Sequence, residues 1–224
     1  MELKQATSTI PIVFVSVVDP VGAGLVESLA RPGGNLTGLS IISKDIVGKR
    51  WGLFKEAVPT LSRVALLIDP NDPTSTATIS AQLNAARSLG LDPHVVEVPT
   101  PDAIEQTFSA IARDGFDGAS VTGAMVTDQR ERVGASALAH KMPTVGGSAE
   151  TVSSGLLMSY GPDYLDFERK AAVYADKILK GAKPADLPVE QPTRLKFVIN
   201  LRAARAFGLT ISPTLLIAAD ELIE

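Results

Sequence analysis

The chain has 224 residues, enough for one domain or two small ones with a substantial hydrophobic core. Its composition, with 45% apolar and 21% charged residues, is that of a globular protein, and a net charge of −4 without clustered Lys and Arg argues against a nucleic-acid partner. The absence of cysteine excludes disulfides, thiolate metal sites and cysteine nucleophiles, and it fits a periplasmic or a cytosolic protein equally.

The first predicted elements lie within residues 10–58. Ile10–Val18 is a nearly continuous β-branched run, which is typical of a strand buried on both faces of a parallel sheet, and it ends at Asp19-Pro20. A short helix is predicted over 21–30, a second strand over 37–42 and an amphipathic helix over 44–58. This part of the chain therefore contributes two strands and two helices.

From residue 63 onward, strands and helices alternate regularly. The apolar patterns predict strands at 63–68, 94–98, 118–122 and 143–145, and helices at 75–89, 101–113 and 127–140. Strands that alternate with helices of this length form βαβ units with right-handed crossovers. The predicted fold class is therefore α/β, with a parallel sheet in a three-layer α/β/α arrangement.

The last part of the chain begins with a strand over 155–160, which is closed by Gly161-Pro162. A helix is predicted over 163–180, with acidic residues in its first turn and lysines near its end. Residues 183–188 are too rich in proline for regular structure, and a further strand is predicted over 194–200. This order indicates a segment that leaves one packed layer and returns to it.

Two stretches carry a resemblance to a known family. GLLMSYGPDYLDFERKAAVYADKILKGAKPADLPVEQPTRLKFVINLRAARAFGLTI is similar to the C-terminal part of the ABC-transporter substrate-binding proteins of the tryptophan/tyrosine-type family, and STIPIVFVSVVDPVGAGLVESLARPGGNLTGLS resembles the middle of the same proteins. The resemblance is collinear and covers nearly all of the chain. It implies the two-lobed type I periplasmic-binding-protein fold, in which each lobe is flavodoxin-like.

The resemblance also implies how the chain divides between the two lobes. Residues 1–42 with 159–185 would belong to the N-lobe, and residues 43–158 with 186–224 to the C-lobe. In the family, further strand-helix units precede the point that matches Lys4, so we expect the N-lobe to be incomplete in this chain. Because two strands rarely form a stable sheet alone, we expect a homo-oligomer or a segment swap to cover the exposed edge.

By resemblance, the protein is the solute-binding component of an ABC transporter and not an enzyme. Its partners would be an ABC permease and a small solute, an amino acid and possibly an aromatic one, bound in the cleft between the lobes. The family is periplasmic or lipid-anchored outside the cytoplasm. Met1-Glu2-Leu3-Lys4 has no apolar signal core, so we expect no signal peptide in this chain, and no apolar run approaches the roughly 20 residues of a membrane span.

The residues predicted to bind the ligand follow the carboxyl ends of the strands, where open α/β sheets place ligands. Hydroxyls and amides can take a carboxylate, an acidic side chain an ammonium group, and an aromatic ring an apolar side chain. The same small and polar residues are also what turns require. The candidates are Asp19, Ser40, Asp69, Asn71, Thr122, Ser148, Glu150 and Tyr160.

Two alternative functions share this fold, an enzyme and the effector-sensing domain of a regulator. Gly22-Ala23-Gly24 is half of a dinucleotide-binding fingerprint, but Glu27 stands where the third glycine is needed. Gly146-Gly147-Ser148-Ala149-Glu150 is close to a nucleophile elbow but lacks the last glycine. His94 and His140 are predicted to be solvated surface residues. We therefore predict no catalytic residue, no cofactor and no metal. An α/β enzyme that acts on a nucleotide or a carboxylate, and the effector-sensing domain of a regulator, are the alternatives.

Overall fold

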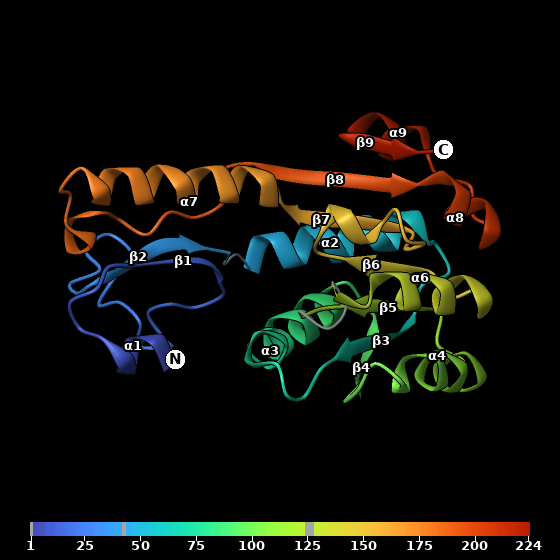
Figure 1. The fold of residues 1–224 in the computed structure, drawn as a ribbon. Helices are drawn as coiled ribbons and strands as arrows, with labels where there is room; N and C mark the ends of the chain where they lie inside the picture. The colour runs from blue at the N-terminus through green and yellow to red at the C-terminus, as the bar shows by residue number, and fades with distance from the viewer. Residues whose placement is uncertain (1, 42–43, 124–127) are drawn as a thin grey trace. The chain divides into compact units, whose positions relative to one another are not determined.

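The computed structural model describes residues 2–41, 44–123 and 128–224, drawn in Figure 1. These residues form two compact units. Unit 1 consists of residues 1–42 and 162–194, and unit 2 of residues 43–161 and 195–224. Ile42 and Thr127, which were predicted to lie in a strand and in a helix, are outside the described residues.

The described strands of unit 2 form one seven-stranded sheet in the order β4-β3-β5-β6-β7-β8-β9. Strand β3 pairs in parallel with both β4 and β5, and the pairs β5–β6, β6–β7 and β8–β9 are also parallel. The predicted α/β class with a parallel sheet is confirmed. The bounds are β3 (Arg63–Ile68), β4 (Asp92–Glu97), β5 (Gly118–Val121), β6 (Thr144–Gly146), β7 (Met158–Pro162), β8 (Leu195–Asn200) and β9 (Glu221–Ile223).

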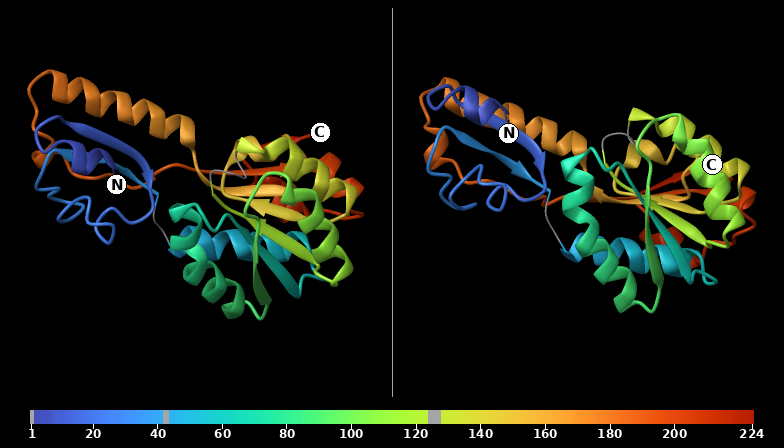
Figure 2. Two further views of the ribbon diagram at one scale, coloured as in Figure 1. Left: turned by 60° about the horizontal axis from the view of Figure 1, so that its bottom comes forward. Right: turned by 90° about the horizontal axis from the view of Figure 1, so that it is seen from below.

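Helices cover both faces of this sheet, because side chains of a strand point alternately to its two sides. On β3, Val64 packs in one apolar cluster with Phe54, while Ala65 and Leu67 pack in another with Phe108. Figure 2 shows α2 and α3 on one face, and α4 and α6 on the other. The bounds are α2 (Lys44–Ala57), α3 (Pro73–Ser88), α4 (Ala103–Arg113), α6 (Arg130–Ala139), η1 (Ala149–Thr151), α8 (Leu201–Ala206) and α9 (Pro213–Ala218).

Unit 1 is built on a two-stranded parallel sheet of β1 (Ile12–Val17) and β2 (Leu36–Ser40). Helix α7 (Tyr164–Leu179) lies along this sheet in Figure 1, and its Phe167 and Tyr174 pack against Leu39 of β2. Asp163 caps the helix by accepting a hydrogen bond from Asp166 N at 3.3 Å. The unit also contains α1 (Glu2–Ala6) and η2 (Pro184–Asp186).

The helix predicted over 21–30 is wrong, since the structure has turns there. Asp19 Oδ1 accepts a hydrogen bond from Gly22 N at 2.8 Å, and Gly24 has a φ of 65°. Pro32 O accepts from Glu27 N at 3.0 Å, which closes a loop instead of a helical turn. The three glycines and two prolines between residues 20 and 33 therefore favour turns over the weak apolar pattern.

The second part of unit 1 extends further than expected, because residues 186–194 group with unit 1 and not with the second lobe. This segment continues the β1–β2 sheet through a parallel bridge between Leu39 and Glu190. Ser40 N donates to Glu190 O at 2.9 Å, and Glu190 N donates to Gly38 O at 3.0 Å. The short elements α1, α8, α9 and β9 were not predicted from the sequence.

Candidate ligand site

The order of strands in unit 2 creates a switch point between β3 and β5. The chain leaves β3 through α3 to reach β4 on one side, and it later enters β5 on the other side. The loops after β3 and β5 therefore diverge at the carboxyl edge of the sheet, which is where ligands bind in open α/β sheets. Asp69 and Asn71 follow β3 directly and Thr122 follows β5, so the structure brings these three predicted residues to one place.

The loop after β3 is shaped by its own aspartates. Asp69 Oδ1 accepts a hydrogen bond from Asn71 N at 2.8 Å, as in an Asx turn. Asp69 is half-buried, whereas Asn71 is exposed. One carboxylate oxygen of Asp69 is thus used to hold the loop, which orients the carboxylate at the edge of the sheet.

Ser75, in the first turn of α3, joins the two loops of the switch point. Its hydroxyl oxygen lies 3.1 Å from Asp72 Oδ2 and 3.1 Å from Thr122 O, and the residue is fully buried. A Cβ at Gly123 would lie 2.0 Å from Ser75 Oγ and 2.5 Å from Asp72 Oδ2, so only glycine permits this approach. Among the described residues, the buried Thr122 Oγ1 has no hydrogen-bond partner, which makes it a free polar group at the switch point.

The next strand end contributes Ser148 and Glu150. Ser148 follows β6 closely and donates a hydrogen bond to Glu150 Oε2, while Thr151 Oγ1 donates to Ser148 O at 2.7 Å. Ser148 is buried and Glu150 is exposed. Together with Asp69 and Asp72, Glu150 gives the carboxyl edge of this sheet an acidic character that suits an ammonium group.

Tyr160 lies on β7, and its backbone and ring have different surroundings. Its carbonyl oxygen accepts a hydrogen bond from Arg50 Nε at 2.7 Å. Its ring packs edge-on against Phe197 with a centroid distance of 6.2 Å, alongside the apolar cluster beneath α2. Burial, and secondly the nearby Asp220, raise the pKa of Tyr160. The partly buried ring thus packs against this cluster, and its stacking on a ligand stays a prediction.

The two candidates in unit 1 lie at the carboxyl end of its small sheet. Ser40 is fully buried at the end of β2, with Oγ 3.4 Å from Val18 O. Asp19 is exposed two residues after β1, where its carboxylate accepts from Gly22 N. Unit 1 thus presents a hydroxyl and a carboxylate at a strand end, the same position that the candidates occupy in unit 2.

Sequence reasoning missed Arg50, Asp72 and Ser75. Arg50 is only 8% exposed although it is charged. The signal was present, because Arg50 interrupts the apolar stripe of α2 between Ile46 and Phe54. Asp72 was interpreted only as a turn residue, and nothing in the sequence distinguishes Ser75 from an ordinary residue of a first helical turn.

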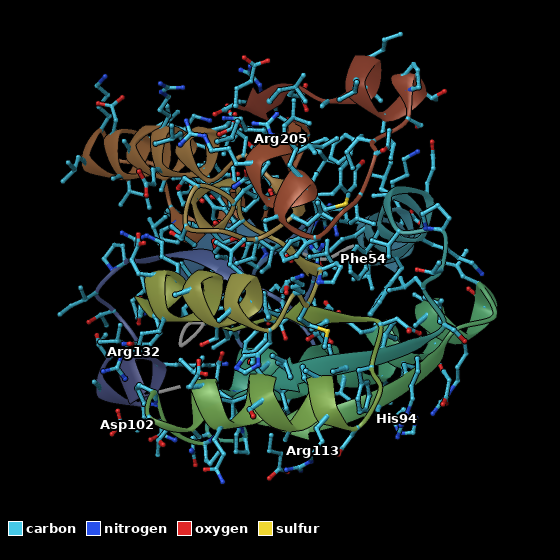
Figure 3. The ribbon with its side chains drawn as sticks, turned by 90° about the vertical axis from the view of Figure 1, so that its right-hand side faces the viewer. Phe54, His94, Asp102, Arg113, Arg132 and Arg205 are labelled. Atoms are coloured by element: carbon cyan, nitrogen blue, oxygen red, sulfur yellow. The ribbon has the colours of Figure 1, made fainter. Side chains whose placement is uncertain are left out.

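The described residues that a phosphate site or a catalytic serine would need do not lie together. No helix follows Gly22-Ala23-Gly24, so this turn lacks the helix N-terminus that a phosphate site needs. His94 pairs with Asp92 at 2.8 Å and lies at the periphery of unit 2 in Figure 3, while His140 pairs with Glu105 at 2.7 Å. Ser148 instead donates its hydroxyl hydrogen to Glu150, and both histidines pair with other carboxylates. Across residues 2–41, 44–123 and 128–224, no group of three or more His, Asp and Glu side chains could hold a metal ion.

An open parallel sheet with hydroxyls and carboxylates at its switch point defines a class of protein, the α/β domains that bind small molecules reversibly. Comparisons with known proteins agree. A family model described as ABC transporter substrate binding protein matches residues 1–223. The chain belongs to this family, as its resemblance predicted, and the family consists of substrate-binding proteins and not of enzymes.

Individual relatives are similar over most of the chain. A tyrosine-binding protein of Clostridioides difficile (strain R20291) is 27% identical over 206 residues, which are 92% of this chain and 59% of the relative. The chain thus spans about three fifths of that curated relative.

In none of the helices that the structure describes is there a segment long and apolar enough to cross a membrane.

Two solved structures have nearly the same fold. The ABC domain from Streptococcus pneumonia in complex with L-Trp has a TM-score of 0.91 at 28% identity and covers 99% of this chain and 74% of its own. A conserved domain protein from Vibrio cholerae has a TM-score of 0.90 at 31% identity, with 98% and 74% covered. These matches confirm the type I periplasmic-binding-protein-like fold.

Proposed function

We propose that this protein is the solute-binding component of an ABC transporter and that its solute is an aromatic amino acid. The observation that carries the proposal is the polar switch point of unit 2, where Asp69, Asp72, Ser75 and Thr122 converge. It is supported by the family of the chain and by two relatives, one named for tyrosine binding and one solved with L-Trp.

The chemistry of the switch point fits the polar end of an amino acid. The carboxylates of Asp69, Asp72 and Glu150 can accept hydrogen bonds from an α-ammonium group. The Thr122 hydroxyl, which has no partner among the described residues, can donate to a carboxylate. By the resemblance of the chain to its family, Asp19 and Ser40 of unit 1 are also proposed to be solute-binding residues. The partner that receives the solute is proposed to be an ABC permease, and the location to be outside the cytoplasm, periplasmic or lipid-anchored.

Calorimetric titration tests this proposal directly. L-Tyrosine and L-tryptophan are titrated into this chain and into any longer natural form that contains it, with L-lysine and galactose as controls. We expect saturable binding of the aromatic amino acids alone. Absence of binding by every form of the protein would contradict the assigned solute class.

A pair of variants tests the proposed position of the solute. Asp69→Asn removes a carboxylate at the carboxyl edge of the sheet, and we expect the affinity to fall by about tenfold or more, since a hydrogen bond to a charged group is lost. Asp92→Asn removes a carboxylate at the opposite edge, at the start of β4, and serves as the matched control. Equal affinities of both variants would place the solute elsewhere.

We also propose that a second copy of the chain, or a swapped segment, covers the open edge of unit 1. Among the described strands, β1 pairs only with β2, and Val15 on β1 is 40% exposed. Light scattering is expected to give a mass above that of a monomer. Val15→Lys should lower it, because a charge on an edge strand opposes pairing. A monodisperse monomer of the unaltered chain would contradict this proposal.

A further inference from the structure

Arg50 is a buried cation with a specific position in the fold. It lies on α2 among residues that pack into the apolar cluster, and only 8% of it is exposed. A guanidinium group taken out of water is stable only where hydrogen-bond acceptors surround it. Its Nε donates a hydrogen bond to Tyr160 O at 2.7 Å. Only Gly161 separates Tyr160 from the point where the chain passes from unit 2 to unit 1.

Two glycines make room for this contact. A Cβ at Gly147, just after β6, would lie 2.9 Å from Arg50 Nη2 and 3.2 Å from Cζ. A Cβ at Gly161, on β7, would lie 1.9 Å from Gly147 O. The guanidinium therefore lies directly against the backbone at the ends of β6 and β7, where larger residues would keep these strand ends and the arginine apart.

The contact lies close to the points where the chain passes from one unit to the other. There are three such passages, between residues 42 and 43, 161 and 162, and 194 and 195. Unit 2 begins at residue 43, and α2, which carries Arg50, follows at once. Tyr160 precedes the second passage, between residues 161 and 162. Arg50 thus ties together, on the side of unit 2, the two segments that lead into these passages.

A second tie lies on the side of unit 1. Asp163 follows the second passage and Arg194 precedes the third, between residues 194 and 195. Arg194 Nε lies 3.5 Å from Asp163 Oδ2, and Asp163 N donates to Arg194 O at 3.1 Å. Each unit therefore holds two of the connecting segments together next to its own boundary.

We propose that Arg50 is a positioning residue of the hinge. It fixes the ends of β6 and β7 to α2, so that the end of β7 next to the boundary at residues 161 and 162 stays formed. An effect on solute affinity rests on the proposed function, because the solute is proposed to bind at the carboxyl ends of these strands. The fixation itself is a property of the solute-free chain.

The test is hydrogen exchange of backbone amides in the solute-free protein. In Arg50→Met, the amides of residues 158–161 and of Asp163 should exchange about tenfold faster or more, because a charge-assisted hydrogen bond is lost and the β7 end opens locally. Arg63→Met is the matched control, since Arg63 also donates to a backbone carbonyl of unit 2, Asp114 O, at 2.6 Å, but at the opposite edge of the sheet. The control should leave exchange at residues 158–161 and Asp163 unchanged.

A glycine variant keeps the test decisive even if Arg50→Met does not fold. Gly147→Ala pushes the guanidinium away without removing it and should accelerate exchange at the same amides. Gly52→Ala, on α2 with no atom within 4 Å of its new Cβ, should not. Unchanged protection of these amides in Gly147→Ala, or equal protection in Arg50→Met and Arg63→Met, overturns the proposal. Because no solute is present, this result is independent of whether the chain binds an amino acid.

Discussion

Units 1 and 2 use the same local pattern, a parallel strand followed by a polar turn, but they are stabilised very differently. In unit 2 the seven-stranded sheet has an extensive apolar cluster on each face. In unit 1 the two-stranded sheet is supported by two small clusters, one around Leu36 and Val189 and one around Leu39 and Phe167. Polar residues of the kind that bind ligands can therefore follow a strand in a unit with a small core. The stability of that unit, however, depends on how much apolar surface it buries.

The difference also shows which segments unit 1 depends on. Its second cluster contains Phe167 and Tyr174 of α7, which lie far along the chain from β2. The segment around Glu190 adds backbone hydrogen bonds to the outer edge of β2. Unit 1 is thus held by a few long-range contacts, while unit 2 is held by two extensive apolar clusters, one on each face of its sheet.

The largest effect is expected from the core of unit 2. Phe54 is fully buried on α2, in the interior of unit 2 in Figure 3, and its ring centroid lies 6.1 Å from that of Trp51. Phe54→Ala should lower the free energy of unfolding by about 3–5 kcal/mol, through lost burial and a new cavity. Urea denaturation followed by the fluorescence of Trp51, the chain's single tryptophan, measures this.

The control for this core variant is Val95→Ala, whose side chain is 40% exposed on β4. It should change the free energy of unfolding by no more than about 0.5 kcal/mol. A loss in Phe54→Ala as small as that of the control would contradict an extensive apolar cluster around Phe54 in unit 2.

A smaller loss in the free energy of unfolding is expected when the hydroxyl of Tyr174 in unit 1 is removed. Tyr174 OH donates to Pro188 O and lies 3.1 Å from Glu190 Oε1. Tyr174→Phe should lower the free energy of unfolding by about 1–2 kcal/mol, and it should increase hydrogen exchange at the amides of Leu187, Val189 and Glu190 more than in unit 2. Equal increases in both units would show that unit 1 does not depend on this contact.

The same tyrosine predicts a pH effect. Burial, followed by the charge of Glu190, raises the pKa of Tyr174 above its usual 10.0. Its neutral form therefore stabilises the folded state fully below pH 10, and this stabilisation is lost as the pH rises above 10, where the unfolded tyrosine ionises. Tyr174→Phe should flatten the alkaline limb of the stability curve, and an unchanged limb would contradict the shift.

On the helical surface of unit 2, a weaker pH effect is expected. Hydrogen bonds from His140 and Ser136 lower the pKa of Glu105. The ionised carboxylate thus contributes stability above the ordinary value of 4.5, and this is lost as the pH falls below it. Glu105→Gln should therefore weaken the acid dependence of thermal unfolding, and an unchanged dependence would contradict the lowered pKa of Glu105.

The smallest effect is expected from an exposed ion pair on α7. Lys180 Nζ lies 2.9 Å from Asp176 Oδ2, and both side chains are more than half exposed. Lys180→Ala should change the free energy of unfolding by about 0.5 kcal/mol or less. A loss comparable with that of Tyr174→Phe would show that surface charges, and not α7's packed face, hold unit 1.

The sequence allowed the sheet of unit 2 to be predicted well, because strands buried on both faces are continuous apolar runs such as residues 64–68 of β3. It failed at 21–30, where turn hydrogen bonds outweigh a short apolar pattern. The candidate site was predicted in part, since strand ends identify Asp69 and Thr122. Ser75 could not be identified, because its importance depends on Thr122, which only the fold brings near. Arg50 could be noticed as a charge in the apolar stripe of α2, but its acceptor Tyr160 could not be predicted.

The most direct test of the account follows the amide signals of the nitrogen-15-labelled protein by NMR while L-tyrosine is added. The account predicts that the amide signals of Asp69, Asn71 and Asp72, and those of residues 122–123 and 147–150, all at the carboxyl edge of the sheet, shift progressively. The signals of Asp92, His94 and residues 116–118 should stay in place, and the amino acid should be recovered unchanged. Shifts confined to the amino edge, or chemical conversion of the added tyrosine, would contradict it.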